Sequence, residues 1–180
     1  MFDLDISIYP TYETERLYLR PTNLSDAAFL LELMNTPAWL ANIGDRKVRT
    51  LQAASDYIRQ RMWPQLAERG YSNNTVVRKA DGVRLGTCGI YHRDGLDTVD
   101  IGFAFLPNYW KMGYAYEASQ HVMDVGRRVY GLTRIGAITT EKNLPSQRLL
   151  EKLGLTYRRI LHLPNDPEPL RYYEWEKHAE

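Results

Sequence analysis

The spacing of apolar residues along the chain changes repeatedly between the two-residue period of strands and the longer period of helices. Residues 16–21 alternate polar and apolar side chains as a half-buried strand does, and Pro21 closes the run. An apolar stripe with helical spacing follows over residues 24–34, where Asn23 and Asp26 make a plausible helix cap with an acidic first turn. The N-terminal part of the chain therefore predicts a strand followed by a helix.

A second helical pattern covers residues 51–69 and follows the candidate cap Thr50. Pro64 lies inside this pattern, and we expect it to kink or split the helix, because proline has no N–H to donate. Between the two helices, residues 36–49 form a long connection with aromatic residues and a Gly-Asp turn. Long connections of this kind are often functional.

Further strand and helix patterns alternate through the rest of the chain. The expected strands cover 71–79, 83–91, 98–105, 134–139, 157–163 and 170–175, and the expected helices cover 114–129 and 143–153. Short turns join the first three of these strands, which is typical of an antiparallel meander. The pattern predicts an α/β fold with a mixed, mostly antiparallel central sheet flanked by helices on both faces.

Composition narrows the class of protein. The 180 residues are 44% hydrophobic and 25% charged, which predicts a single domain over residues 1–180. A net charge of +1 provides no broad basic surface for nucleic acid, and no apolar run approaches the ~20 residues that span a bilayer, so neither partner is expected. The polar opening has no signal-peptide pattern, and we expect a cytoplasmic protein, monomer or homodimer.

The cysteine and histidine residues do not predict a metal site or a thiol nucleophile. Cys88, the single cysteine, excludes an internal disulfide and lies in an alternating run, which favours a small buried side chain. The four histidines lack ligand spacing, so no metal is expected. His92 falls near a strand end, where a lone histidine is more often solvated.

The stretch 100–118 carries the strongest functional signal. Pro107 ends a strand over 100–105, and Gly113 precedes a helix whose first N–H groups lack partners inside it. Such a helix start favours phosphate oxygens, so the junction is interpreted as a pyrophosphate cradle. The absence of G-x-G-x-x-G and of G-K-[ST] disfavours nicotinamide and ATP, and an ordinary strand-loop-helix corner stays open as the alternative.

Residues 110–118 (WKMGYAYEA), preceded by DIGF at 100–103, resemble the acyl-CoA loop of the GNAT superfamily of N-acetyltransferases. The match is to its ribosomal-protein alanine N-acetyltransferase-like (Rim-type) branch, although Trp110 stands where Gln or Arg is usual and Lys111 where that branch has glycine. NLPS at 143–146 with RLLEKLGL at 148–155 resembles a second motif of the branch, and TERLYLRP at 14–21 its first strand. The resemblance covers nearly the whole chain and implies a GNAT-like fold.

The resemblance implies that acetyl-CoA is the co-substrate and that its acetyl group moves to a primary amine by direct attack. The acceptor would be a protein N-terminus or a small amino compound. A CoA-binding module that has lost catalysis is the alternative, although intact Asn143 and Ser146 favour the enzyme. The implied cofactor-binding residues are Phe103, Ala104, Phe105, Lys111, Met112, Gly113, Tyr114, Ala115, Tyr116, Asn143 and Ser146.

The resemblance also implies catalytic residues. Many GNAT enzymes protonate the leaving thiolate with a tyrosine, but Leu150 occupies that position here, so the role passes to Ser146, with Asn143 holding the pantetheine arm. Helix capping is the other interpretation of both polar residues. Asp100 is the candidate base, and Glu141 is its alternative.

In the GNAT fold, the connection over 36–49 overhangs the acceptor side of the cleft, which makes Trp39, Ile43 and Asp45 candidate substrate contacts. A linker whose Trp39 packs on the core is the alternative. The cations at 46, 47 and 49 favour an acceptor with a carboxylate, or a polypeptide terminus, over a polyamine. The alternative is that these side chains only face solvent or reach the CoA phosphates. Glu117 is also expected in the family loop, but the sequence assigns it no physical role.

Overall fold

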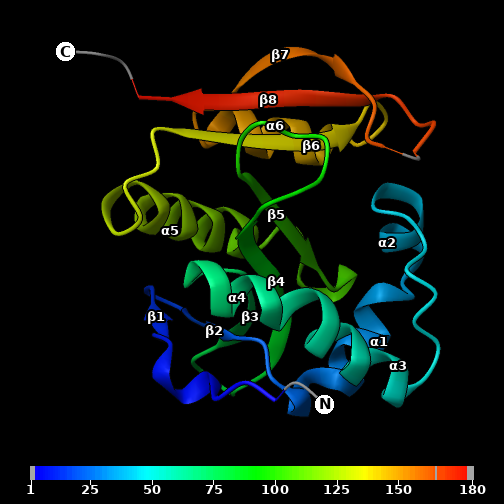
Figure 1. Cartoon of the computed structure of the whole chain (residues 1–180), viewed down its shortest axis with the longest axis vertical. Coiled ribbons are helices and arrows are strands. Elements are labelled where there is room, and N and C mark those ends of the chain that lie inside the picture. The colour runs from blue at the N-terminus through cyan, green and yellow to red at the C-terminus, as the bar shows by residue number, and fades with distance from the viewer. Residues whose placement is uncertain (1–2, 165, 178–180) are drawn as a thin grey trace.

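A computed structural model describes residues 3–164 and 166–177 of the chain. The described strands form one eight-stranded sheet in the order β1-β2-β3-β4-β5-β6-β8-β7 (Figure 1). The strands are β1 (Tyr12–Glu13), β2 (Leu17–Pro21), β3 (Asn73–Arg78), β4 (Arg84–Tyr91), β5 (Asp100–Phe105), β6 (Arg134–Thr140), β7 (Thr156–Leu161) and β8 (Leu170–Glu176). Every pairing is antiparallel except that of β5 with β6, which confirms the predicted mixed, mostly antiparallel sheet.

The parallel pair β5 and β6 is joined at one point, where Asp100 pairs with Gly136. Beyond that point the two strands separate, and Figure 1 shows β5 running away from the layer formed by β6 and β8. The backbone of Gly136 donates to Val99 O at 2.8 Å, which holds the two halves together at the base of the split. The separation leaves an opening in the middle of the sheet.

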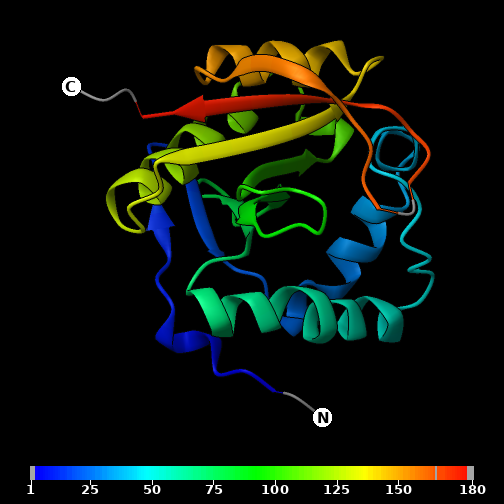
Figure 2. The ribbon, with the colours of Figure 1, turned by 45° about the horizontal axis from the view of Figure 1, so that its top comes forward.

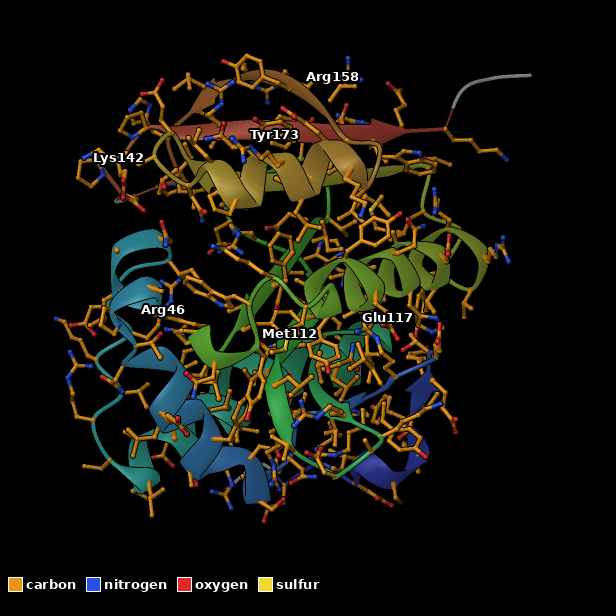
Figure 3. The ribbon with its side chains drawn as sticks, turned by 180° about the vertical axis from the view of Figure 1, so that it is seen from behind. Arg46, Met112, Glu117, Lys142, Arg158 and Tyr173 are labelled. Carbon is orange, nitrogen blue, oxygen red and sulfur yellow. The ribbon has the colours of Figure 1, made fainter. Side chains whose placement is uncertain are left out.

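Helices cover both faces of the sheet, as predicted. On one face, α5 (Tyr114–Arg128) and α6 (Leu144–Lys152) pack on buried strand residues such as Leu19 and Ile101. On the other lie α1 (Ala27–Met34), α3 (Leu51–Tyr57) and α4 (Trp63–Arg69), which share a second apolar cluster around Leu30, Ile58 and Trp63. Figures 1 and 3 view the sheet from opposite sides and show these two helical layers in turn.

The predicted helix over 51–69 is interrupted, as Pro64 suggested. A π-helical segment, Ile58–Met62, separates α3 from α4, and Trp63 N–H donates to Ile58 O. Pro64 stands in the first turn of α4, directly after the π-helical segment, a helix position at which proline is tolerated. Figure 2 shows the three segments as one rod along the edge of the molecule.

The predicted connection over 36–49 contains a short helix that the pattern did not indicate, α2 (Pro37–Asn42). Thr36 Oγ1 caps it by accepting from Trp39 N, and Pro37 occupies its first turn, a start signal that was present in the sequence. Two further differences are small. The two-residue strand β1 was not predicted, and some strand ends lie one or two residues from their predicted positions.

Cys88 is fully buried, as predicted, and burial raises the pKa of its thiol to about 12, which keeps the thiol protonated. Within residues 3–164 and 166–177, no helix has the length and apolar character needed to cross a membrane. Within the same ranges, no group of three or more His, Cys, Asp or Glu side chains could hold a metal ion.

Candidate active site

A cleft of about 1620 Å³ occupies the opening where β5 and β6 separate. It is lined by β5, by the loop before α5, by the turn before α6 and by the connection after α2. Figure 3 labels one residue on each of these last three segments, Met112, Lys142 and Arg46 respectively. The predicted catalytic, cofactor-binding and acceptor residues line this cleft, except Met112, which is half exposed, and the alternative base Glu141.

The loop before α5 is built to present backbone N–H groups. Lys111 and Gly113 both adopt left-handed backbone conformations, with φ of 61° and 82°. The first turn of α5 begins directly after Gly113 and has no side-chain cap among the described residues. Trp110, which replaces the family's Gln or Arg, donates from Nε1 to Phe105 O at 2.7 Å and ties the loop to the end of β5. The loop therefore offers uncapped N–H groups at the positive end of a helix.

Glu117, to which the sequence assigned no role, holds α5 against the turn between β1 and β2. Its carboxylate accepts from Thr14 Oγ1 and from both the backbone and the side chain of Arg16. Partial burial favours the protonated form of Glu117, but these hydrogen bonds outweigh it and lower the pKa of the carboxyl. Glu117 is therefore an anchor for the first turn of α5.

Asp100 is a buried carboxylate and not a solvated strand end, because its residue exposure is only 1%. One oxygen, Oδ2, accepts from Arg93 Nε at 3.1 Å, whereas Oδ1 has no partner in the described part of the chain. Burial raises the pKa of the Asp100 carboxyl, and the Arg93 guanidinium opposes that rise without cancelling it. Asp100 lines the cleft and has the properties of a general base.

Tyr91 lies opposite Asp100 on β4 and was not singled out from the sequence. Its hydroxyl donates to Asn73 Oδ1 at 2.6 Å. Its ring covers Gly102, where a Cβ atom would stand only 2.6 Å from Tyr91 Cε2. Burial raises the pKa of Tyr91 well above its ordinary value, so the phenol stays neutral. The strand register that places Tyr91 beside Asp100 could have been anticipated, but the contact with Gly102 could not.

Asn143 and Ser146 occupy the first turn of α6 and face the cleft together. Asn143 Oδ1 accepts from the backbone N of Ser146 at 3.3 Å, so Asn143 is the cap. The Ser146 hydroxyl takes no part in this cap. Leu150 is 1% exposed and belongs to the core, and the exposed Glu141 does not line the cleft. The geometry thus favours Asp100 over Glu141 as the base.

The three candidate acceptor contacts differ in their surroundings, although all line the cleft. Trp39 is only 9% exposed, packs in the second apolar cluster and donates from Nε1 to Gly44 O at 3.1 Å, so it mainly supports the connection. Ile43 is 38% exposed. Asp45 accepts from Lys47 N and from Arg49 Nη2, each at 2.7 Å. Ile43 and Asp45 therefore have more surface available to a ligand than Trp39.

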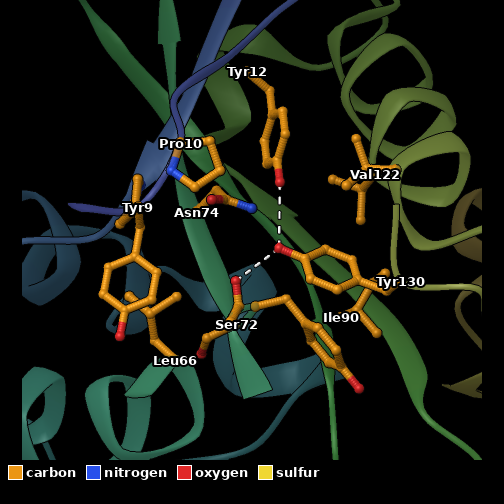
Figure 4. A pocket seen from close by; sticks show the side chains of 13 residues that line it. Tyr9, Pro10, Tyr12, Leu66, Ser72, Asn74, Ile90, Val122 and Tyr130 are labelled. Carbon is orange, nitrogen blue, oxygen red and sulfur yellow. Dashed lines mark hydrogen bonds between the residues drawn. The ribbon is translucent and has the colours of Figure 1, made fainter. Parts of the chain in front are cut away.

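His92 also lines the cleft, and its Nε2 lies 3.0 Å from the hydroxyl of Tyr71. Burial and the positive charge of Arg69 lower the pKa of His92, so the ring is neutral at pH 7. A second and much smaller cavity, of about 30 Å³, is lined by Tyr71 among other residues, and Figure 4 shows Tyr12, Tyr130 and Val122 around it. The hydroxyls of Tyr12 and Tyr130, which lie 3.4 Å apart, belong to its lining, and the cavity has room for little more than a water molecule.

Comparisons with known proteins agree with this architecture. Residues 16–156 match the family model of the acetyltransferase (GNAT) domain. The N-acetyltransferase p20 of Bacillus licheniformis, itself uncharacterized, is 32% identical over 84% of this chain and 85% of its own length. An acetyltransferase from Agrobacterium tumefaciens str. C58 superposes with a TM-score of 0.79 at 23% identity, covering 98% of this chain and 99% of its own.

A second structural neighbour belongs to the branch that the sequence motifs resemble. It is RimL, a ribosomal L7/L12 alpha-N-protein acetyltransferase in complex with coenzyme A, with a TM-score of 0.76 at 16% identity, covering 95% of this chain and 100% of its own. At this identity the likeness concerns the fold. Because the family model covers most of the chain, the chain belongs to the GNAT acetyltransferase family and is an acetyl-CoA-dependent N-acetyltransferase.

Proposed function

We propose that the enzyme transfers the acetyl group of acetyl-CoA by direct attack of a primary amine bound in the cleft between β5 and β6. The observation that carries the proposal is Asp100, a buried carboxylate that lines the cleft and keeps one oxygen without a partner in the described residues. Such an oxygen can accept the proton that an attacking amine must lose.

The donor would bind along the loop before α5. The uncapped N–H groups of Tyr114, Ala115 and Tyr116 suit the diphosphate, and the glycine at 113 permits the positive φ with which the loop enters the helix. Phe103, Ala104 and Phe105 would flank the pantetheine arm on β5, and Asn143 would hold it from α6. The thioester would then lie in the opening of the sheet.

In the reaction, the amine nitrogen forms a bond to the thioester carbon as the carbon–sulfur bond breaks. The amine loses a proton towards Asp100, and the Ser146 hydroxyl donates a hydrogen bond to the departing thiolate. A thiol of pKa ~8.5 is a moderate leaving group, so one positioned donor is a useful aid. Leu150 cannot supply this donor, because its side chain is apolar and buried.

The base need not be strong. A protein α-amino group has a pKa of about 7.7 to 8.0 and is partly neutral at pH 7, whereas a lysine amine at ~10.4 is not. The raised pKa of Asp100 makes its carboxylate a better base than an ordinary one but still a weak base for lysine. We therefore favour an α-amine, of a polypeptide terminus or of a small amino compound, over a lysine side chain.

Positive charge at the acceptor end of the cleft also disfavours a polyamine as the acceptor. Arg46 and Lys47 line the cleft without an ion-pair partner among the described residues, whereas Arg49 is paired with Asp45. Ile43 and Asp45 would contact the acceptor at this end, beside the partly buried Trp39. A polyamine would meet repulsion there, and a carboxylate would be attracted.

The test is the release of free thiol from acetyl-CoA across a panel of amines: short peptides with free N-termini, the same peptides with blocked termini and one lysine, amino acids and spermidine. We expect turnover with free N-termini or amino acids, and loss of that turnover in Asp100→Asn. Efficient turnover of spermidine at physiological salt would contradict the charge argument. Binding of CoA without thiol release from any amine would instead favour a catalytically silent CoA-binding module.

A further inference from the structure

We propose that Arg16, on the turn between β1 and β2, is a positioning residue that holds the loop before α5 in the conformation that receives the diphosphate of acetyl-CoA. The inference rests on the donor site proposed above and assigns a function to a residue that does not line the cleft. Its evidence is a set of contacts between segments about a hundred residues apart in the chain.

The guanidinium of Arg16 contacts Met112 and Tyr114, the two neighbours of Gly113. Its Nη1 donates to Met112 O at 3.0 Å, and its central carbon lies 4.4 Å from the centre of the Tyr114 ring. Its Nη2 lies 3.2 Å from the position that a Cβ atom would take on Gly113. Arg16 therefore supports the loop from outside the lining of the cleft, since neither Arg16 nor Met112 lines it whereas Gly113 does.

The hydrogen bond to Met112 O decides which group of that peptide unit faces the ligand. In a trans peptide, the carbonyl of residue 112 and the N–H of residue 113 point in opposite directions. Because Arg16 binds the carbonyl of Met112, this oxygen, which would repel a phosphate, points towards Arg16. The N–H of Gly113 then points in the opposite direction, where it can bind the phosphate. The backbone is left-handed at both Lys111 and Gly113, and this conformation is unfavourable for the lysine. The loop therefore needs contacts such as those of Arg16 to hold it in place.

Glu117 in turn fixes Arg16. Its Oε2 accepts from Arg16 Nε at 2.7 Å, and its Oε1 accepts from Arg16 N at 2.8 Å and from Thr14 Oγ1 at 2.6 Å. The guanidinium is thus held by an acid on the first turn of the same helix that would bind the diphosphate. A lysine could keep the charge but could not bind Glu117 and Met112 O together, because it lacks the planar fork of arginine.

The experiment compares two donors in Arg16→Ala and Arg16→Lys. Acetyl-CoA carries the diphosphate, and S-acetylpantetheine lacks it. We expect both variants to raise KM for acetyl-CoA by about 10-fold or more, with kcat/KM for S-acetylpantetheine within about twofold of the wild type. Calorimetric Kd values for CoA and pantetheine should show the same split, and they require no acceptor.

Arg127→Ala is the matched control, because Arg127 also binds an acid, Asp124, and lies over an aromatic ring, that of Trp175, at the far end of α5. It should leave both donors unchanged. Equal losses with both donors, or recovery of CoA affinity in Arg16→Lys, would overturn the positioning role in favour of general stability or simple charge attraction. If wild-type protein itself fails to bind CoA, the proposed donor site fails and not this inference alone.

Discussion

Arg93 binds one carboxylate oxygen of Asp100 and leaves the other without a partner in the described chain. Both Nε and Nη2 of Arg93 lie 3.1 Å from the same oxygen, Oδ2. The pair connects the loop after β4 to the start of β5, at the point where β5 and β6 begin to separate. The positive charge of Arg93 thus favours the deprotonated form of this buried carboxylate, against the effect of burial.

The first prediction concerns this pair. The positive charge of Arg93 opposes the effect of burial on Asp100, so Arg93→Ala should raise the pKa of the carboxyl further. The acid limb of kcat/KM against pH should then move to higher pH, because the base works only when it is deprotonated. Arg93→Lys, which retains a charge, should move the limb less. Each variant is compared with the wild type on the same acceptor, so the titration of the amine itself affects both equally. If the pH profiles of kcat/KM for the variants and the wild type superimposed, Asp100 would not be the base.

Asp100→Asn should abolish most turnover and yet raise the melting temperature at pH 7. The folded-state pKa of Asp100 is raised, so the folded protein binds this proton more tightly than the unfolded chain does. Stability from this group is therefore greatest below the unfolded pKa and falls as pH rises through the folded pKa. The asparagine side chain does not ionise, so the variant does not lose this stability as pH rises. Its higher melting temperature relative to the wild type should disappear near pH 3. A lower melting temperature at pH 7 would show instead that the pair with Arg93 is net stabilising.

Replacing Ser146 by alanine should lower kcat by about 10²-fold, the lower end of what a positioned proton donor contributes, with little change in acetyl-CoA affinity. Stability should hardly change, because the cap uses the backbone N of Ser146 and the side chain of Asn143. Thr50→Ala provides the contrast, since Thr50 Oγ1 caps α3 by accepting from Ala53 N. That variant should lose about 1 kcal/mol of stability and keep its kcat. Normal kcat in Ser146→Ala would leave the serine without a catalytic role.

Gly113→Glu should abolish the stabilisation of the protein by acetyl-CoA. At about 100 times Kd, a ligand contributes about 2.7 kcal/mol to the free energy of unfolding, which a thermal melt detects readily. The new side chain would be strained in a left-handed position, and its Cβ would stand 3.2 Å from Arg16 Nη2, so the loop could not keep the conformation that presents its N–H groups. Its carboxylate would also add a negative charge near the expected diphosphate. NAD and ATP should give little shift even with the wild type.

The matched control is Gly131→Glu. Gly131 also has a positive φ, of 64°, but a side chain there would meet nothing within 4 Å. This variant should carry the same kind of backbone penalty and keep the full acetyl-CoA shift. A full shift in Gly113→Glu as well would take the loop out of the donor site.

Much of the fold was predictable because its signals are local. The alternation of side chains, the interruption at Pro64 and the stop at Pro107 depend on neighbours a few residues away, and each is present in the structure. The phosphate-type loop before α5 could be recognised for the same reason, since a helix start and its glycine are adjacent in sequence. The sequence alone thus determined the family, the mostly antiparallel sheet and the segments that border the cleft.

Only the tertiary structure decided the environments of the side chains in that cleft. Burial of Asp100, its pairing with Arg93 and the contact of the Tyr91 ring with Gly102 depend on how side chains pack around the strands once the chain has folded. Trp39 was equally compatible with a ligand contact and with the core until its burial was known. Glu117 had no role from its neighbours, because its partners Thr14 and Arg16 are separated from it by 103 and 101 residues. Local patterns report the preferences of short segments, whereas desolvation and ion pairing are set by contacts between segments that only folding brings together.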